Sequence, residues 1–231
     1  MKKFNLVTSL ISLLVFPISV YANDDIVDLQ KNHWAYESCI KVTDKYKIMS
    51  VFPDHTFRGN KAINKFELSA ITLKLIQILE NDGLKASVNT NKIDYPETFF
   101  EEALNDKIYS SSISDLKDKY NIYLGFPDEL KFDGKSEISK TELSLYINST
   151  VNLFLGEKDL NKNPYAYEKT NDEKTTISKE ELLKNTIEDI KTRKILNITD
   201  KTRNEKVNRY ELAVVLIKTL EYINNYSKHH F

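Results

Sequence analysis

The hexapeptide INKFEL at residues 63–68 returns as ISKTEL at 138–143 and as VNRYEL at 207–212. We call these hexapeptides the first, second and third box. Each has a β-branched apolar residue, then Asn or Ser, a base, a variable residue, Glu and Leu. The second and fifth positions predict a capping box, in which an N-cap side chain and a Glu three residues later each bond the other's backbone N–H. The boxes therefore predict three helices that begin alike, with these capping pairs: Asn64 and Glu67, Ser139 and Glu142, Asn208 and Glu211.

The residues after each box continue the helical pattern. Apolar residues and Thr stand 3, 4, 7, 8 and 11 positions after each box leucine, which is the spacing of one buried helical face. An apolar-aromatic segment that reads as a helix end precedes each box, at 42–49, 116–123 and 190–196. The chain has only five Gly and five Pro, which disfavours a turn-rich β fold. We therefore predict an all-α fold made of three helix-loop-helix units.

The base in each box is not explained by helix formation. Lys65, Lys140 and Arg209 occupy the first helical position, where the positive end of the helix dipole disfavours a cation by about 0.3–1 kcal/mol. One hypothesis is that each base and its helix N-terminus form an anion site. The alternative is that each base pairs with a neighbouring acid, or covers apolar surface with its stem.

Charge and the N-terminal stretch bear on location and partners. The net charge of −1 gives no reason to expect a nucleic-acid partner. Two lysines, an apolar run and the sequence VYA at 20–22 predict a signal peptide at 1–22, cleaved after Ala22. No later stretch is apolar enough to cross a membrane, so we expect an exported protein without a transmembrane segment. Cys39 is the only cysteine and cannot form an internal disulfide.

Several motifs together resemble the S-layer homology (SLH) module. They are Trp34-Ala35 near the start of a helix, the loop sequence FPDHTF at 52–57, a second FPD at 126–128, and the boxes themselves. The resemblance implies three divergent SLH-like repeats packed in a pseudo-threefold arrangement. It also implies a noncatalytic protein of the cell envelope or cell surface that binds cell-wall polysaccharide or a peptidoglycan-linked glycan, often through anionic pyruvate ketals, with an envelope protein as a further possible partner.

The resemblance also assigns roles to residues. The box base contacts the anionic sugar substituent, and the Trp and the loop Asp line grooves between modules. The implied glycan-binding residues are Lys65, Lys140, Arg209, Trp34, Asp54 and Asp128, with no catalytic residue, metal or cofactor. Two boxes carry Lys, which lacks the planar two-pronged donor of Arg. We therefore expect one or two working sites, at Arg209 or in the groove of the first repeat.

The repeats divide the chain as follows. The signal peptide (1–22) precedes repeat 1 (23–80), an inter-repeat segment (81–111), repeat 2 (112–155), a second inter-repeat segment (156–177), repeat 3 (178–224) and a C-terminal tail (225–231).

The sequence also bears on three alternatives to glycan binding. An EF-hand-like calcium protein is disfavoured, because the four loops that could be aligned to it lack the Gly at position six and the full set of acidic ligands. A wall hydrolase is disfavoured, because the four histidines show no metal spacing and no nucleophile motif occurs. An interaction scaffold that keeps the SLH fold without glycan binding stays open.

Overall fold

The computed structural model describes residues 26–88, 95–122, 124–125, 129, 131–155 and 179–230. Three sequence predictions lie outside these residues: the signal peptide at 1–22, the inter-repeat segment at 156–177 and the glycan-binding role of Asp128.

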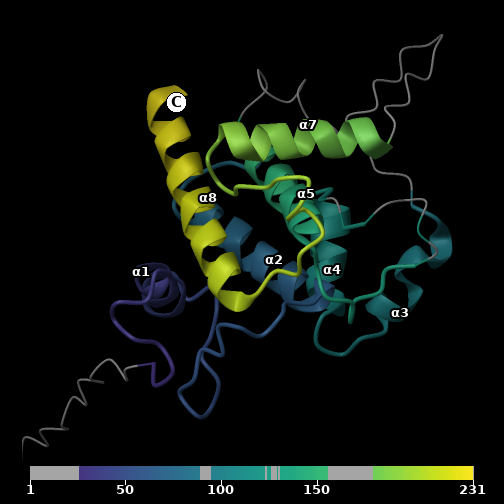
Figure 1. The fold of residues 1–231 in the computed structure, drawn as a ribbon. Helices are drawn as coiled ribbons and strands as arrows, with labels where there is room; N and C mark the ends of the chain where they lie inside the picture. Colours follow the sequence, from purple (N-terminus) through teal and green to yellow (C-terminus); the bar gives the residue numbers. More distant parts are fainter. Residues whose placement is uncertain are drawn as a thin grey trace, which may run out of the picture.

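The fold is all-α, as the sequence predicts (Figure 1). Within the described ranges, extended pairing is limited to three isolated bridges. In chain order, the elements are α1 (Tyr36–Ile40), the π-helical turn η1 (Lys41–Lys45), α2 (Lys65–Asn81), the 3-10 turn η2 (Glu97–Phe100), α3 (Glu101–Leu104), α4 (Ser110–Ser114), the π-helical turn η3 (Asp115–Lys119), α5 (Lys140–Asn152), α7 (Lys179–Thr192) and α8 (Arg209–His230). No helix in this part of the chain has the length and apolar content needed to span a membrane.

The three long helices that follow the boxes begin with complete capping boxes. At α2, Asn64 Oδ1 accepts the Glu67 N–H at 2.8 Å and Glu67 Oε2 accepts the Asn64 N–H at 3.2 Å. The same reciprocal bonds link Ser139 with Glu142 before α5, and Asn208 with Glu211 before α8. Each cap satisfies donors that an isolated helix end leaves open, and so fixes where the helix starts.

The helices that precede the boxes also end alike. Each is followed by a residue in the left-handed region and then by a fully buried isoleucine. The left-handed residues are Lys47 (φ 53), Asn121 (φ 51) and Lys194 (φ 57), and the isoleucines are Ile48, Ile122 and Ile195. A left-handed residue stops a helix and turns the chain, which here brings the isoleucine into the core.

The boxes meet at the centre of the molecule. Ile63 N–H donates to Val207 O at 3.0 Å, Val207 N–H to Ile138 O at 3.0 Å, and Ile138 N–H to Ile63 O at 2.9 Å, which closes a ring of three hydrogen bonds. All three side chains are fully buried in the hydrophobic core. Segments far apart in sequence are therefore joined through the residue that opens each box.

Each preceding helix packs on a long helix from elsewhere in the chain. α1 lies against α8, α4 against α2, and α7 along α5. Figure 1 shows α7 across α5, and α1 beside the N-terminal half of α8. We call the surfaces where these pairs of helices meet the α1–α8, α2–α4 and α5–α7 junctions. The candidate site lies at one of them.

Two of the segments predicted to lie outside the repeats contain helix. The tail predicted at 225–231 is helical through His230, because α8 continues past the last buried apolar residue, Ile223. Tyr226 packs partly on the core, and the ring of His230 stacks on it at 4.0 Å, which supports the last turn. The segment predicted as an inter-repeat at 81–111 contains η2 and α3 and the first two residues of α4.

Candidate functional site

The backbone amides at the starts of the three long helices are already bonded. At the first helical position, Lys65 N–H donates to Ser136 O, Lys140 N–H to Glu205 O and Arg209 N–H to Lys61 O, at 3.0–3.1 Å. At the second, Phe66 N–H donates to Gly134 O, Thr141 N–H to Arg203 O and Tyr210 N–H to Gly59 O, at 2.9–3.0 Å. The third amide of each helix belongs to the capping box. These helix ends therefore lack the free amides that an anion site of the predicted kind uses.

The side chains of Lys65 and Lys140 form ion pairs between boxes. Lys65 Nζ lies 3.2 Å from Glu142 Oε1 and 3.5 Å from Glu129 Oε2, with 8% of its side chain exposed. Lys140 Nζ lies 2.7 Å from Glu205 Oε2 and 3.1 Å from Glu211 Oε1. Both bases thus contact the capping glutamate of the next box, which is the arrangement that the sequence left open as the alternative to an anion site.

Titration behaviour agrees with this pairing. Burial would raise the pKa of Glu142, but bonds from Ser139 and the charge of Lys65 outweigh it and lower the pKa below 4.5. Burial would lower the pKa of Lys140, but Glu205 and Glu211 outweigh it and raise the pKa above 10.5. Both groups are held in their charged forms by partners within the fold.

Arg209 is bound differently. Its Nε donates to Phe57 O and its Nη2 to Ser50 O, each at 2.7 Å. The guanidinium carbon lies 4.6 Å from the ring centre of Phe57 and 5.1 Å from that of Phe52. Burial lowers the pKa of Arg209. In the described part of the chain, no carboxylate lies within ion-pair distance of this guanidinium.

A different lysine supplies the ion pair that Arg209 lacks. Lys61 Nζ lies 2.5 Å from Oε1 of Glu67, the capping glutamate of the first box. Lys61 stands two residues before its box, at the position that Glu205 holds before the third box. Lys61 thus pairs with the capping glutamate of the first box, whereas Lys65 and Lys140 pair with those of the second and third boxes.

Asp54 stabilises its own loop. Its carboxylate accepts the Thr56 hydroxyl at 2.5 Å, the Thr56 N–H at 3.1 Å and Arg58 Nη2 at 2.8 Å. The Thr56 hydroxyl and then Arg58 hold its pKa well below the usual range for Asp. Asp28, which the sequence reading missed, fixes the same loop, because its carboxylate accepts the N–H groups of Phe57 and Arg58 at 2.6 and 2.8 Å.

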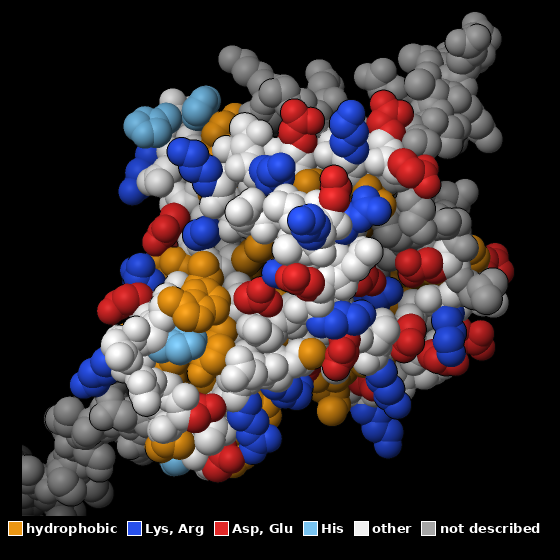
Figure 2. Space-filling view, viewed as in Figure 1, with side chains coloured by type: hydrophobic (Ala, Val, Ile, Leu, Met, Phe, Trp, Pro, Cys, Tyr) orange, Lys and Arg blue, Asp and Glu red, His pale blue; other side chains and the backbone are white. Residues whose placement is uncertain are grey.

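Trp34 stands on the surface within a group of rings. It is 64% exposed, and its ring centre lies 5.5 Å from that of His33 and 6.3 Å from that of Tyr210. Tyr210 also stacks on His33 at 4.3 Å and on Phe57 at 5.7 Å. We call His33, Trp34, Phe57 and Tyr210 the aromatic junction. Figure 2 shows hydrophobic side chains gathered around a histidine where Figure 1 places α1 beside α8.

Local geometry holds the rings of the aromatic junction in place. Tyr210 covers Gly59 so closely that a Cβ there would lie 2.0 Å from the tyrosine ring. His33 Nδ1 accepts the Ala35 N–H at 3.2 Å, so the neutral ring carries its proton on Nε2. The aromatic junction thus combines the exposed indole of Trp34 with the Nε2–H donor of His33, and the packing of Tyr210 on Gly59 supports both rings.

A ring also covers a glycine in the second junction, but not in the third. Phe66 covers Gly134 as Tyr210 covers Gly59, and a Cβ on Gly134 would lie 2.3 Å from the phenylalanine ring. Tyr109 stacks on Phe66 with ring centres 5.0 Å apart. In the third junction, Thr141 and Arg203 occupy the positions of the ring and the glycine.

Sequence reasoning missed His33, Tyr210 and the two glycines. A signal for the glycines was present, because Gly59 and Gly134 both stand four residues before a box, and an aromatic residue stands at the fourth position of the first and third boxes. That these residues contact one another across boxes is evident only in the fold.

The described residues offer neither a metal site nor a reactive thiol. Among the residues that the structure describes, no cluster of His, Cys, Asp or Glu is arranged to hold a metal ion. Cys39 is fully buried, and burial raises the pKa of its thiol to about 12, so it stays protonated at neutral pH.

No protein-family model matches this chain, and a comparison with curated proteins found no match.

Proposed function

We propose that the chain consists of three related SLH-like helix-loop-helix units in a pseudo-threefold arrangement. Four recurring features support this: the capping boxes, the left-handed residue after each helix that precedes a box, the ring of hydrogen bonds between boxes, and the backbone hydrogen bonds from the start of α2, α5 and α8 to a distant loop. Units that pair in this cyclic way bury the face that each one alone leaves open.

We further propose that this is an exported, noncatalytic cell-envelope protein that attaches to wall polysaccharide through the aromatic junction. The observation that carries the proposal is Trp34, a large apolar side chain exposed to 64% and backed by His33 and Tyr210. An exposed aromatic surface with a polar donor beside it suits a sugar, which presents both an apolar ring face and hydroxyl groups.

Arg209 provides the preference for an anionic glycan. Its guanidinium carbon is buried 4.6 Å from the ring centre of Phe57, a member of the aromatic junction, and no acid pairs with it among the described residues. Its charge therefore acts on a ligand from below the surface, while the exposed contacts come from Trp34 and His33. Lys65 and Lys140 are assigned to the fold, because their ammonium groups are bound between boxes.

A pull-down on purified wall sacculi tests this function. The parent protein and Trp34→Ala are incubated with sacculi before and after removal of the wall-linked polysaccharide. We expect the parent to bind only the untreated sacculi, and Trp34→Ala to lose at least about tenfold in affinity, or about 1.4 kcal/mol.

Ile108→Ala is the matched control. Ile108 is 76% exposed and stands two residues before α4, as Trp34 stands two residues before α1. It should bind like the parent. Equal binding by Trp34→Ala and the parent would refute the assignment to the aromatic junction.

A second candidate is an interaction scaffold without glycan binding. The observation that favours it is the engagement of Lys65 and Lys140 in ion pairs, which removes two of the three bases that the SLH resemblance implies for the ligand. Sacculus binding that persists after removal of the polysaccharide would support this function instead.

A further inference from the structure

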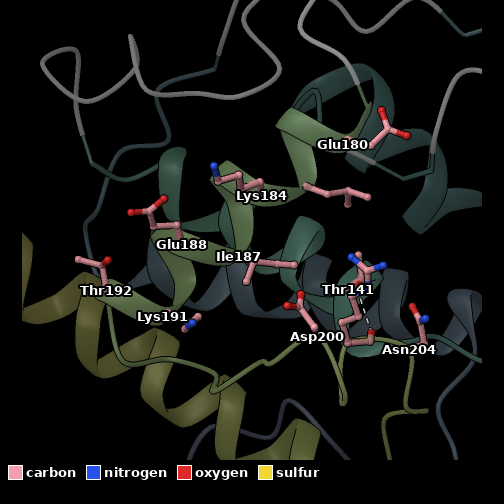
Figure 3. A pocket seen from close by; sticks show the side chains of 11 residues that line it. Thr141, Glu180, Lys184, Ile187, Glu188, Lys191, Thr192, Asp200 and Asn204 are labelled. Carbon is pink, nitrogen blue, oxygen red and sulfur yellow. Dashed lines mark hydrogen bonds between the residues drawn. The ribbon is translucent and has the colours of Figure 1, made fainter.

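The junction between α5 and α7 has a pocket at the place where a ring covers a glycine in the other two junctions. A pocket of about 750 Å³ lies between α7, the loop after it and the start of α5. Figure 3 shows Lys184, Ile187 and Glu188 on α7, with Thr141, Asp200 and Asn204 on the opposite wall. Its remaining lining residues are Glu180, Leu183, Lys191, Thr192 and Arg203.

The pocket has a local cause in the sequence. In the other junctions, a ring at the second helical position lies on a glycine, as Tyr210 lies on Gly59. Here that position is Thr141, whose hydroxyl donates to Arg203 O at 2.9 Å. A small side chain replaces the ring and a long one replaces the glycine, so the space that a ring would fill stays open.

The charges that line the pocket are balanced, and all of the residues that carry them are exposed. Three acids and three bases line it: Glu180, Glu188, Asp200, Lys184, Lys191 and Arg203. Within the described ranges, none of these six side chains forms an ion pair or hydrogen bond, in contrast to the bases of the first and second boxes. Along α7, opposite charges alternate at 180, 184, 188 and 191, which is a rise of about 6, 6 and 4.5 Å.

This balance selects the chemistry of a ligand. A polyanion would meet three carboxylates and a polycation three bases, so a ligand of one sign is repelled by half of the wall. A molecule that carries both signs can pair with both sets. The apolar part of the lining is aliphatic, from Leu183 and Ile187, and it contains no aromatic ring on which a sugar could stack.

We propose that this pocket binds a short zwitterionic peptide. A carboxylate of the peptide pairs with Lys184, Lys191 or Arg203, its ammonium group pairs with Glu180, Glu188 or Asp200, and its aliphatic side chains lie on Leu183 and Ile187. The volume suits a peptide of a few residues, since small-ligand pockets span about 300–1,000 Å³. This site is separate from the aromatic junction and does not depend on the function proposed there.

The test is a titration of the isotopically labelled protein with tetra-alanine, followed by backbone amide NMR shifts. We expect saturable shifts confined to α7, residues 199–204 and the start of α5, with a Kd of about 1 mM or tighter. Tetra-alanine with acetylated and amidated ends lacks both charges and should bind at least about tenfold more weakly.

Two variants connect binding to the pocket. The double variant Thr141→Phe, Arg203→Gly places a ring over a glycine, as in the other two junctions. It should fill the pocket and abolish the NMR shifts. Its thermal unfolding midpoint should stay at or above that of the parent. If it fails to fold, Lys184→Glu on the exposed face of α7 serves instead and should weaken binding at least about tenfold. Lys201→Glu, in the same loop but outside the pocket, should bind like the parent.

Three outcomes would overturn the proposal: no saturable shifts at peptide concentrations well above the millimolar range, equal binding of free and capped peptide, or unchanged binding by Lys184→Glu. Because the readout does not involve Trp34 or the wall polysaccharide, failure here leaves the function of the aromatic junction untouched, and the reverse also holds.

Discussion

The aromatic junction and the α5–α7 junction are built on the same backbone plan and differ in their side chains. In both, the second amide of a long helix donates to a loop carbonyl, from Tyr210 to Gly59 and from Thr141 to Arg203. In the first, a ring closes the space and supports an exposed Trp34. In the second, a pocket of about 750 Å³ remains. The backbone bonds hold the molecule together, and two side-chain positions decide what each junction presents to a ligand.

The largest expected effect comes from removing the ring that closes the aromatic junction. Tyr210→Ala should lower the free energy of unfolding by about 3–5 kcal/mol, because a buried aromatic side chain stacked on two others is replaced by a cavity. Thr141→Ala, at the same place in the open junction, loses one exposed hydrogen bond and should cost about 1 kcal/mol or less. Urea unfolding followed by circular dichroism measures both. Equal losses would show that the two junctions do not differ as described.

The glycine beneath the ring gives the next effect. Gly59→Ala places a Cβ 2.0 Å from the ring of Tyr210, and the displacement should cost up to about 3 kcal/mol. Arg203→Ala, at the matching position of the open junction, should change stability by less than about 0.5 kcal/mol. The double variant Gly59→Ala, Tyr210→Ala should cost less than the sum of its parts, since the clash disappears with the ring.

Ion pairs distinguish the two junctions further. Lys140 lies in the α5–α7 junction, where its side chain is 13% exposed between Glu205 and Glu211. Lys140→Met should lower the free energy of unfolding by about 2 kcal/mol, because two acids are left without their base. Lys61 lies beside the aromatic junction, where its side chain is 42% exposed. Lys61→Met should lower the free energy of unfolding by less than about 1 kcal/mol. A smaller loss for Lys140→Met than for Lys61→Met would contradict the distinction.

The smallest effect is a pH dependence in the remaining junction, where Lys65 pairs with Glu142. The pKa of Glu142 is lowered below 4.5 by Ser139 and Lys65 despite burial, so its charge contributes stability above pH 4.5 that is lost as the pH falls through the lowered value. The stability of Glu142→Gln should therefore fall less steeply with acid than that of the parent. Parallel curves would mean that the Glu142 charge does not stabilise the fold.

Local signals in the sequence were enough for the helices and not for the site. The capping pairs, such as Asn64 with Glu67, act within four residues, so a hexapeptide predicts them. The first helical amides, at Lys65, Lys140 and Arg209, donate to loop carbonyls that lie 65 to 148 residues away in the sequence, and no local pattern contains such distant partners. Trp34 was identified through the SLH resemblance, but its support by Tyr210 joins residues at opposite ends of the chain.

The fluorescence of Trp34 tests the central claim most directly, because Trp34 is the only tryptophan in the chain and is largely exposed. The purified protein is titrated with polysaccharide released from the wall. If the glycan covers the aromatic junction, the emission maximum shifts to shorter wavelength and saturates, and unrelated neutral dextran has no effect. If the protein binds the polysaccharide by pull-down while its tryptophan emission stays unchanged, the glycan binds elsewhere and the account of the aromatic junction is wrong.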